Sequence, residues 1–172
     1  MQKAYIALGA NLGNPVATIN DAIDALVALH GSIFLAMSSL YRTAPVGQIE
    51  QMRRQPDFIN AVVAVKTHLS PREMLDELFA IEARFGRIRT PGTVKNAPRT
   101  LDLDLLLHGD TAMHVNGLTL PHPRMHERAF VLAPLAEVAP ELVIPGKGTV
   151  AALLAACGDQ RIHMLTPAAA AE

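Results

Sequence analysis

The sequence predicts an α+β fold in which two long helices lie against one face of an antiparallel sheet. Short apolar runs of strand character alternate with two amphipathic helical patterns. The predicted order is strand, helix, strand, strand, helix, strand, with shorter helical segments at the end. The chain has 172 residues, half of them hydrophobic, which suits one core in one domain.

The first half of this order consists of a strand, a helix and two extended segments. Residues 4–8 form a short apolar run closed by glycines, which predicts a buried strand. Asn14 and Pro15 are typical of a helix start, because asparagine can cap the first turn and proline there leaves no unsatisfied N–H. Apolar residues then recur at helical spacing. Residues 33–42 and 58–67 are predicted to be strands, joined by a polar loop.

The second half begins with the clearest helix signal in the chain. Residues 70–73, Ser-Pro-Arg-Glu, combine a capping box with proline at the first helical position, and the apolar face that follows stops at Gly86. A strand over 101–107 comes after a basic loop. Two further helical segments are predicted, at 127–139, interrupted by its proline, and at 149–157.

This order suits a ferredoxin-like antiparallel sheet with the two main helices on one face and the additional helices on the other. No internal repeat or linker divides the chain, so we expect residues 1–166 to form a single domain. Residues 167–172, PAAAAE, are predicted to be a flexible tail.

Composition argues against several classes of partner. The 15 basic and 16 acidic residues nearly balance, which disfavours nucleic acid and anionic membrane, so any anion site must be local. A single cysteine, Cys157, excludes an internal disulfide and suggests a small buried thiol. The N-terminal residues lack the apolar length of a signal or membrane span. We expect a cytoplasmic monomer that binds small molecules.

Asp102 and Asp104 alternate with leucines in the predicted strand over 101–107. Successive side chains point to opposite faces of a strand, so both acids share one face, with Cα atoms about 6.6 Å apart. At that spacing they can converge on one cation, or on two cations about 4 Å apart. The alternative is a solvated face of an exposed strand, although the apolar run that follows favours a strand that is buried rather than at the edge of the sheet.

Four basic residues lie just before these acids: Arg87, Arg89, Lys95 and Arg99. Carboxylates suit Mg²⁺, which often completes its shell with substrate phosphates, and guanidinium groups suit phosphate oxygens. The alternative for each base is a solvated loop. The glycine and proline content predicts that residues 87–98 close over bound substrates as a lid.

Residues 118–132 bring together two histidines and two arginines. His122 and His126 have the spacing of zinc ligands on a helix, but Pro123 interrupts a continuous helix and no third ligand is evident. Contact between an imidazole and a phosphate fits the neighbouring motifs better. Neither GANLGN nor GKGT matches a known phosphate-binding loop.

The run KNAPRTLDLDLL resembles the signature of the hydroxymethyldihydropterin pyrophosphokinase family of the folate pathway. Further segments resemble that family in the same order, and together they cover about residues 4–146. These are YIALGANLGN, SSLYRTAPVG, DFINAVV, IEARFGRIR and LTLPHPRMHERAFVLAPLAEVAPEL.

The resemblance implies a ferredoxin-like enzyme that transfers a pyrophosphoryl group from MgATP to the hydroxymethyl oxygen of a reduced pterin and releases AMP. It implies two Mg²⁺ ions on Asp102 and Asp104, with catalytic roles for those acids and for Arg89, Lys95 and Arg99. The implied ATP-binding residues are Glu82, Arg87, Leu105, Thr119, His122 and Arg128. The implied pterin-binding residues are Thr43, Ala44, Pro45, Val46, Phe58, Asn60 and Phe130.

The sequence departs from the family pattern at several positions. It has no tryptophan, and Lys95 is followed by asparagine where some members place a basic residue beside a tryptophan. Phe58 replaces a common tyrosine and Ala44 a common proline. Phe79 and Gly117 stand where a glutamine and an arginine often reach ATP. These changes bear on affinity and loop order rather than on the reaction class.

Two other functions compete with this interpretation. The acids and His122 would also suit a metal-dependent phosphohydrolase, which would release inorganic phosphate instead of AMP and a pyrophosphorylated pterin. A ferredoxin-like module without activity would bind RNA or a regulatory ligand. The balanced charge and only seven Phe and Tyr residues disfavour RNA.

Overall fold

The computed structural model describes residues 1–45, 54–86 and 100–165. Its main sheet has six strands, and every pair is antiparallel. The strands run in the spatial order β10-β3-β4-β1-β5. Strand β2 also pairs with β4, with residues 63–67, whereas β3 pairs with residues 58–60. They are β1 (Gln2–Ala10), β2 (Ser32–Met37), β3 (Tyr41–Thr43), β4 (Phe58–Thr67), β5 (Asp102–His108) and β10 (Ile162–Met164).

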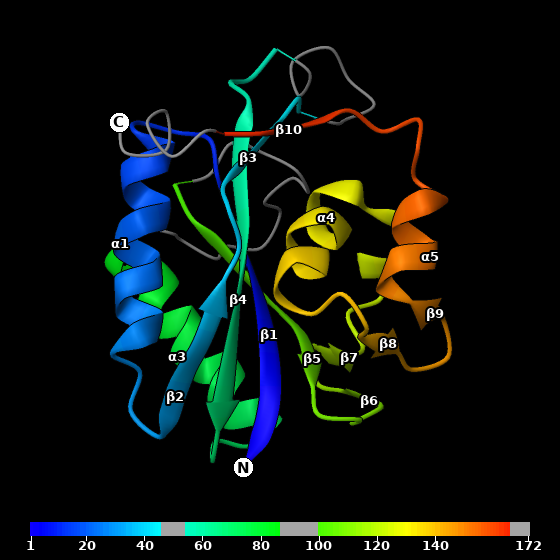
Figure 1. Ribbon diagram of the computed structural model, residues 1–172. Helices are drawn as coiled ribbons and strands as arrows, with labels where there is room; N and C mark the ends of the chain where they lie inside the picture. The colour runs from blue at the N-terminus through cyan, green and yellow to red at the C-terminus, as the bar shows by residue number, and fades with distance from the viewer. Residues whose placement is uncertain (46–53, 87–99, 166–172) are drawn as a thin grey trace.

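Helices cover both faces of this sheet. Figure 1 shows α1 (Pro15–Val27) and α3 (Pro71–Arg84) on one face, and α4 (Ala129–Val138) and α5 (Val150–Ala155) on the other. This arrangement confirms the predicted ferredoxin-like α+β fold. The remaining elements are the 3-10 turn η1 (Met125–Glu127) and two small hairpins, β6 (Met113–Val115) with β7 (Leu118–Leu120) and β8 (Val143–Ile144) with β9 (Gly148–Thr149).

Both long helices begin at the caps that the sequence predicts. Oδ1 of Asn14 accepts a hydrogen bond from the Ala17 N–H at 3.2 Å at the start of α1. At the start of α3, the Glu73 N–H donates to Oγ of Ser70 at 3.1 Å, and the Ser70 N–H donates to Oε1 of Glu73 at 2.9 Å. These bonds satisfy N–H groups that have no partner within the helix, so each start is fixed locally.

The main core lies between the sheet and the pair α1 and α3. Alternate residues of β1, β4 and β5 meet the apolar faces of both helices there. Its largest fully buried side chains include Ile6, Leu8, Ile19, Leu26, Met74, Leu78, Ile81 and Leu103. Each such side chain contributes roughly 1.5–3 kcal/mol to folding by leaving water.

A second core fills the opposite face, under α4 and α5. It contains Tyr5 and Leu107 from the sheet and Leu132 from α4. Cys157 is buried at its margin, as predicted, and burial raises the pKa of its thiol. None of the helices in the described ranges is long and apolar enough to cross a membrane.

Two strands depart from a regular ladder in which successive side chains alternate between the two faces. The predicted strand over 33–42 is divided into β2 and β3 at Ser38, whose hydroxyl accepts the Val62 N–H at 2.9 Å in place of a backbone carbonyl. In β5, Leu106 is an extra residue, because Ile6 pairs with Leu105 while Tyr5 pairs with Leu107.

The helical segment predicted at 127–139 is different from the observed one. Pro134 lies inside α4 and does not interrupt it. The segment is buried between the sheet and α5, and this packing outweighs the lost hydrogen bond. The hairpins and β10 were not predicted, because strands of two or three residues are too short to show a period.

Candidate active site

The two acids of the predicted metal site lie on one face of β5. Leu103 and Leu105, which alternate with them, are 1% and 4% exposed and belong to the core under α1 and α3. Asp102 and Asp104 are half-buried and face the opposite side, where α4 packs. The predicted alternation is therefore confirmed, and the strand is buried on its leucine side. The prediction that it lies away from a sheet edge is wrong, because β5 is the last strand of the main sheet within the described residues.

The donor set at this position suits magnesium better than zinc. Within residues 1–45, 54–86 and 100–165, no three His, Cys, Asp or Glu side chains are grouped so as to hold a metal ion. His122 and His126 thus have no third ligand in this part of the chain. Asp102 and Asp104 would give a cation two hard oxygen donors and leave its other positions to water and phosphate oxygens. That coordination is typical of Mg²⁺ bound together with a nucleotide.

Two small residues of β1, Gly9 and Ala7, form the surface of the sheet next to the acids, and this surface is called the floor of the site. Gly9 pairs with Asn60 of β4 on one side and with Asp102 of β5 on the other, and Ala7 pairs with Asp104. Paired residues share a face, and neighbouring strands are about 4.8 Å apart, so Asn60 and Asp102 lie about 10 Å apart across Gly9. A Cβ on Gly9 would lie 3.3 Å from Oδ1 of Asn60. The floor between these polar groups therefore depends on a residue without a side chain.

Asn60 is held in place by β3. It is 6% exposed, and its Nδ2 donates to Oγ1 of Thr43, which is 7% exposed, at 2.8 Å. Phe58, at the start of β4, pairs with Thr43 and is half-buried on the same face. A buried amide whose position is fixed by one hydrogen bond can present its remaining groups to a flat heterocycle.

Phe130 lies on the helix that covers this face. It is half-buried near the start of α4, and Cζ of Arg128 lies 5.5 Å from the centroid of its ring. The side chain of Gln160 accepts the Ala129 N–H at 2.9 Å and donates to the Glu127 carbonyl at 2.7 Å. The start of α4, and with it the Phe130 ring, is thereby anchored.

Two residues of the implied ATP site lie on the other side of the sheet. Glu82 of α3 is 1% exposed, and its Oε2 accepts the Leu103 N–H at 2.8 Å. The Leu105 side chain is buried in the core under α1 and α3. From these positions Glu82 supports the backbone of β5, and Leu105 can reach a ligand on the acid face only through its backbone.

Thr119 and His122 follow the acids along the chain. In β7, Oγ1 of Thr119 is hydrogen-bonded to Nδ1 of His114 at 2.7 Å. The His122 N–H donates to the Leu106 carbonyl at 2.9 Å, two residues along β5 from Asp104. His122 is therefore held beside the acid strand.

Several predicted site residues lie outside the residues that the structure describes. They are Val46, Arg87, Arg89, Lys95 and Arg99, together with the predicted lid over 87–98 and the tail at 167–172. Ala44 and Pro45, exposed and half-exposed, end the described segment just after β3. The structure thus brings together the acids, Gly9 and the Asn60–Thr43 pair on one face.

A buried pair of amides next to this face was not predicted. Nδ2 of Asn11 donates to Oε1 of Gln55 at 2.7 Å and to the Pro56 carbonyl at 3.0 Å. Asn11 and Gln55 are 1% and 9% exposed. They join the end of β1 to the segment that leads into Phe58. The only sequence signal was an amide directly after a buried apolar run.

A second unpredicted contact joins α4 to the β2–β3 junction. The Glu137 carboxylate accepts hydrogen bonds from the Ser39 N–H at 3.1 Å, from the Ser39 hydroxyl at 2.9 Å and from the Tyr41 hydroxyl at 2.5 Å. Burial, followed by the hydrogen bond and charge of Glu137, raises the pKa of Tyr41 well above its ordinary range. No local pattern connects residues 98 positions apart.

Comparison with known proteins shows which family the chain resembles. A family model described as 7,8-dihydro-6-hydroxymethylpterin-pyrophosphokinase matches residues 5–140. A 2-amino-4-hydroxy-6-hydroxymethyldihydropteridine pyrophosphokinase of Haemophilus influenzae is 40% identical over 97% of this chain and 100% of its own. One of Pseudomonas aeruginosa is 42% identical over 96% of this chain and 98% of its own.

Solved structures show the same fold at much lower identity. The chain matches a structure of HPPK-DHPS in complex with substrates with a TM-score of 0.70 and 13% identity, over 90% of this chain and 43% of that one. It matches Plasmodium falciparum HPPK-DHPS wild type with a TM-score of 0.68 and 16% identity, over 90% of this chain and 44% of that one. The chain therefore spans less than half of either, and the likeness concerns the fold alone.

Proposed function

The chain belongs to the 7,8-dihydro-6-hydroxymethylpterin-pyrophosphokinase family and is a pyrophosphokinase of folate biosynthesis, and on this premise we propose how its residues perform the reaction. The substrates are ATP and 6-hydroxymethyl-7,8-dihydropterin, and the products are AMP and the pterin diphosphate. The pterin hydroxymethyl oxygen forms a bond to the β-phosphorus of ATP. The bond from that phosphorus to the oxygen bridging the α- and β-phosphates breaks, and the pterin hydroxyl loses its proton.

Asp102 and Asp104 form the metal end of the site. They would hold two Mg²⁺ ions, which supply neutralisation of the phosphate charge during transfer. The observation that carries this assignment is that both carboxylates lie half-buried on one face of β5, beside a floor of Gly9 and Ala7. That floor leaves room for a triphosphate to approach the strand closely.

Asn60 and Thr43 form the pterin end. The Asn60 amide, fixed by Thr43, offers donor and acceptor groups to the edge of the pterin ring, while Phe58 and Phe130 provide aromatic faces. Ala44, Pro45 and Val46 complete the turn after β3. About 10 Å separates Asn60 from Asp102, a span that suits a bicyclic ring at one end and the transferred phosphorus at the other.

The remaining assignments concern ATP. The backbone contact of His122 with β5 and the contact of Arg128 with Phe130 support a role for both in binding the phosphates of ATP. Thr119 would contact the nucleotide from β7. Glu82 would act by holding the β5 backbone, and Leu105 through its own backbone. Arg87, Arg89, Lys95 and Arg99 are proposed from the family motif as phosphate ligands that stabilise the transferring group.

Single substitutions of the acids test the metal assignment. Asp102→Asn and Asp104→Asn should each lower the rate of AMP formation by about a thousandfold or more, because a transferring phosphate depends on charge neutralisation. Circular dichroism should be unchanged. Asp110→Asn, in the exposed turn after β5, is the matched control and should retain activity. Near-normal turnover in either active-site variant would place the metals elsewhere.

Product analysis tests the reaction itself. With ATP, Mg²⁺ and the reduced pterin, mass spectrometry should detect AMP and a pterin diphosphate in equal amounts. Inorganic phosphate without a phosphorylated pterin would instead identify a phosphohydrolase.

A further inference from the structure

We propose that Glu137 is a positioning residue for the pterin half of the site. The inference rests on the proposed function, in which Asn60, Thr43 and Phe130 bind the pterin. Glu137 has no place in that assignment. It stands near the C-terminal end of α4 and is joined to the sheet by three hydrogen bonds.

The contact is made at an irregular point of the sheet. Between β2 and β3 the backbone leaves the regular ladder, and Ser38 bonds through its hydroxyl to the Val62 N–H. The next residue, Ser39, directs both its N–H and its hydroxyl to the Glu137 carboxylate. A carboxylate accepts hydrogen bonds and donates none, and these three donors occupy three of its roughly four acceptor sites.

The third donor, Tyr41, connects Glu137 to Asn60, whose amide is proposed to bind the pterin. Tyr41 is 4% exposed, and its hydroxyl bonds to Glu137. Tyr41 pairs directly with Asn60 across the β3–β4 ladder, and Thr43, two residues along the same face, accepts the Asn60 amide. Fixing β3 through Tyr41 therefore fixes both neighbours of Asn60.

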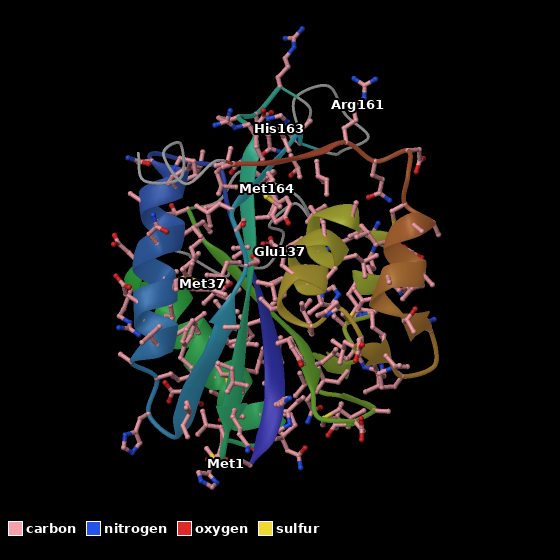
Figure 2. All side chains as sticks on the ribbon, viewed as in Figure 1. Met1, Met37, Glu137, Arg161, His163 and Met164 are labelled. Carbon is pink, nitrogen blue, oxygen red and sulfur yellow. The ribbon has the colours of Figure 1, made fainter. Side chains whose placement is uncertain are left out.

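At its other end, α4 carries Phe130. Residues seven apart occupy nearly the same face of an α-helix, so Phe130 and Glu137 lie along one line of α4, with about 10.5 Å between them along the axis. Figure 2 shows Glu137 between α4 and the central strands. Gln160 anchors the helix at the Phe130 end, and Glu137 anchors it at the opposite end. With both ends fixed, the position of α4, and of the Phe130 side chain that it carries, is set relative to β3.

Removing the carboxylate should loosen the second anchor without exposing a large buried surface, because Glu137 itself is exposed. The expected consequence is a change in the spacing of the pterin pocket rather than unfolding. The acids on β5 lie two strands away from β4 and are held by other contacts. Pterin affinity should therefore fall while nucleotide affinity does not.

The test measures dissociation constants of the full-length protein for a pterin analogue and for a non-hydrolysable ATP analogue with Mg²⁺. Glu137→Ala should raise the pterin constant about tenfold, as expected when a binding group is no longer pre-organised, and should change the nucleotide constant less than about twofold. Glu137→Gln should restore most of the pterin affinity, because its oxygen can accept from Tyr41 while the Ser39 hydroxyl reverses to accept from its amide. Glu141→Ala, which removes an exposed acid just beyond α4, is the control and should match the parent protein.

A double variant separates positioning from general loss of stability. If Glu137 acts through the pocket, Glu137→Ala should add less than about twofold to the effect of Phe130→Ala, because effects of coupled residues are not additive. Full additivity, a parallel loss of nucleotide affinity, or an unchanged pterin constant in Glu137→Ala would each overturn the inference. If Phe130→Ala and Asn60→Ala themselves leave pterin affinity unchanged, the pterin pocket is wrongly assigned and the inference falls with it. Failure of Glu137→Ala alone would leave the proposed pocket intact.

Discussion

Replacing Gly9 with alanine should make the protein more stable and a poorer enzyme. Gly9 lies inside β1, with Asn60 on one side and Asp102 on the other. Its backbone is not in the left-handed region, so alanine is sterically allowed there. Alanine in a strand loses less conformational entropy on folding than glycine does, which should stabilise the fold by about 0.5–1 kcal/mol. For a chain of this size, that gain corresponds to a rise in Tm of about 1–4 °C.

The loss of function follows from one distance. The new Cβ would stand 3.3 Å from Oδ1 of Asn60, closer than the 3.4–4 Å of an ordinary contact, so the amide must move by a few tenths of an ångström. A shift of that size would lengthen the 2.8 Å bond to Thr43 to about 3.1 Å, still within the normal range. The substitution should therefore weaken pterin binding, because the hydrogen bonds between the pterin and Asn60 lose their alignment. Weakening one or two such bonds should raise the pterin KM about three- to tenfold.

The assay combines calorimetry with steady-state kinetics at saturating ATP. The Gly9→Ala variant should combine an equal or higher Tm with a raised pterin KM. In an Asn60→Ala background, where the contact is gone, Gly9→Ala should have no further effect on KM. A stable Gly9→Ala variant with an unchanged pterin KM would refute the idea that the gap over Gly9 is part of the site.

Three further predictions concern stability. Ser70→Ala removes the capping box of α3 and should lower the free energy of unfolding by about 1 kcal/mol in urea titrations, whereas Ser70→Asp should retain most of it. Leu78→Ala, at a fully buried position, should cost about 2–5 kcal/mol in the same titrations, and a loss below 1 kcal/mol would contradict the packing described here. Folding raises the pKa of Tyr41 above its ordinary value of 10.0, chiefly by burial, so the stability linked to its neutral form is complete below pH 10 and is lost as pH rises further. The Tm should therefore fall less steeply with rising pH above 10 in Tyr41→Phe than in the parent protein. Equal slopes of Tm against pH would contradict this.

Features encoded by neighbouring residues were predictable from the sequence. The caps at Asn14 and Ser70 act within three residues, so their patterns predicted where both long helices begin. The alternation of acids and leucines likewise predicted that Asp102 and Asp104 share a face. The proposal that both acids bind metal rests on the family motif, because the spacing by itself also allows a solvated strand.

Features that depend on contacts between distant residues were not predictable. The division between β2 and β3 depends on Ser38 meeting Val62, and the anchoring of α4 depends on Glu137 meeting Ser39. Neither contact leaves a local periodic signal. Pro134 was expected to interrupt a helix, because the propensity of proline was considered without the packing that holds α4 together. Short strands such as β10 form only because β3 offers an edge.

The extra residue at Leu106 lets one strand serve both cores and still present its acids on the face under α4. Leu106 and Leu107 both lie in the core under α4 and α5, while Leu105 lies in the core on the other face. If these residues were paired without a bulge, a regular ladder continued from the Tyr5–Leu107 pair would put Asp104 opposite Leu8 and turn both acids into the core under α1 and α3, where carboxylates have no water. The bulge, more than the identity of any one leucine, therefore sets the face on which the acids lie, and other aliphatic side chains could replace the leucines.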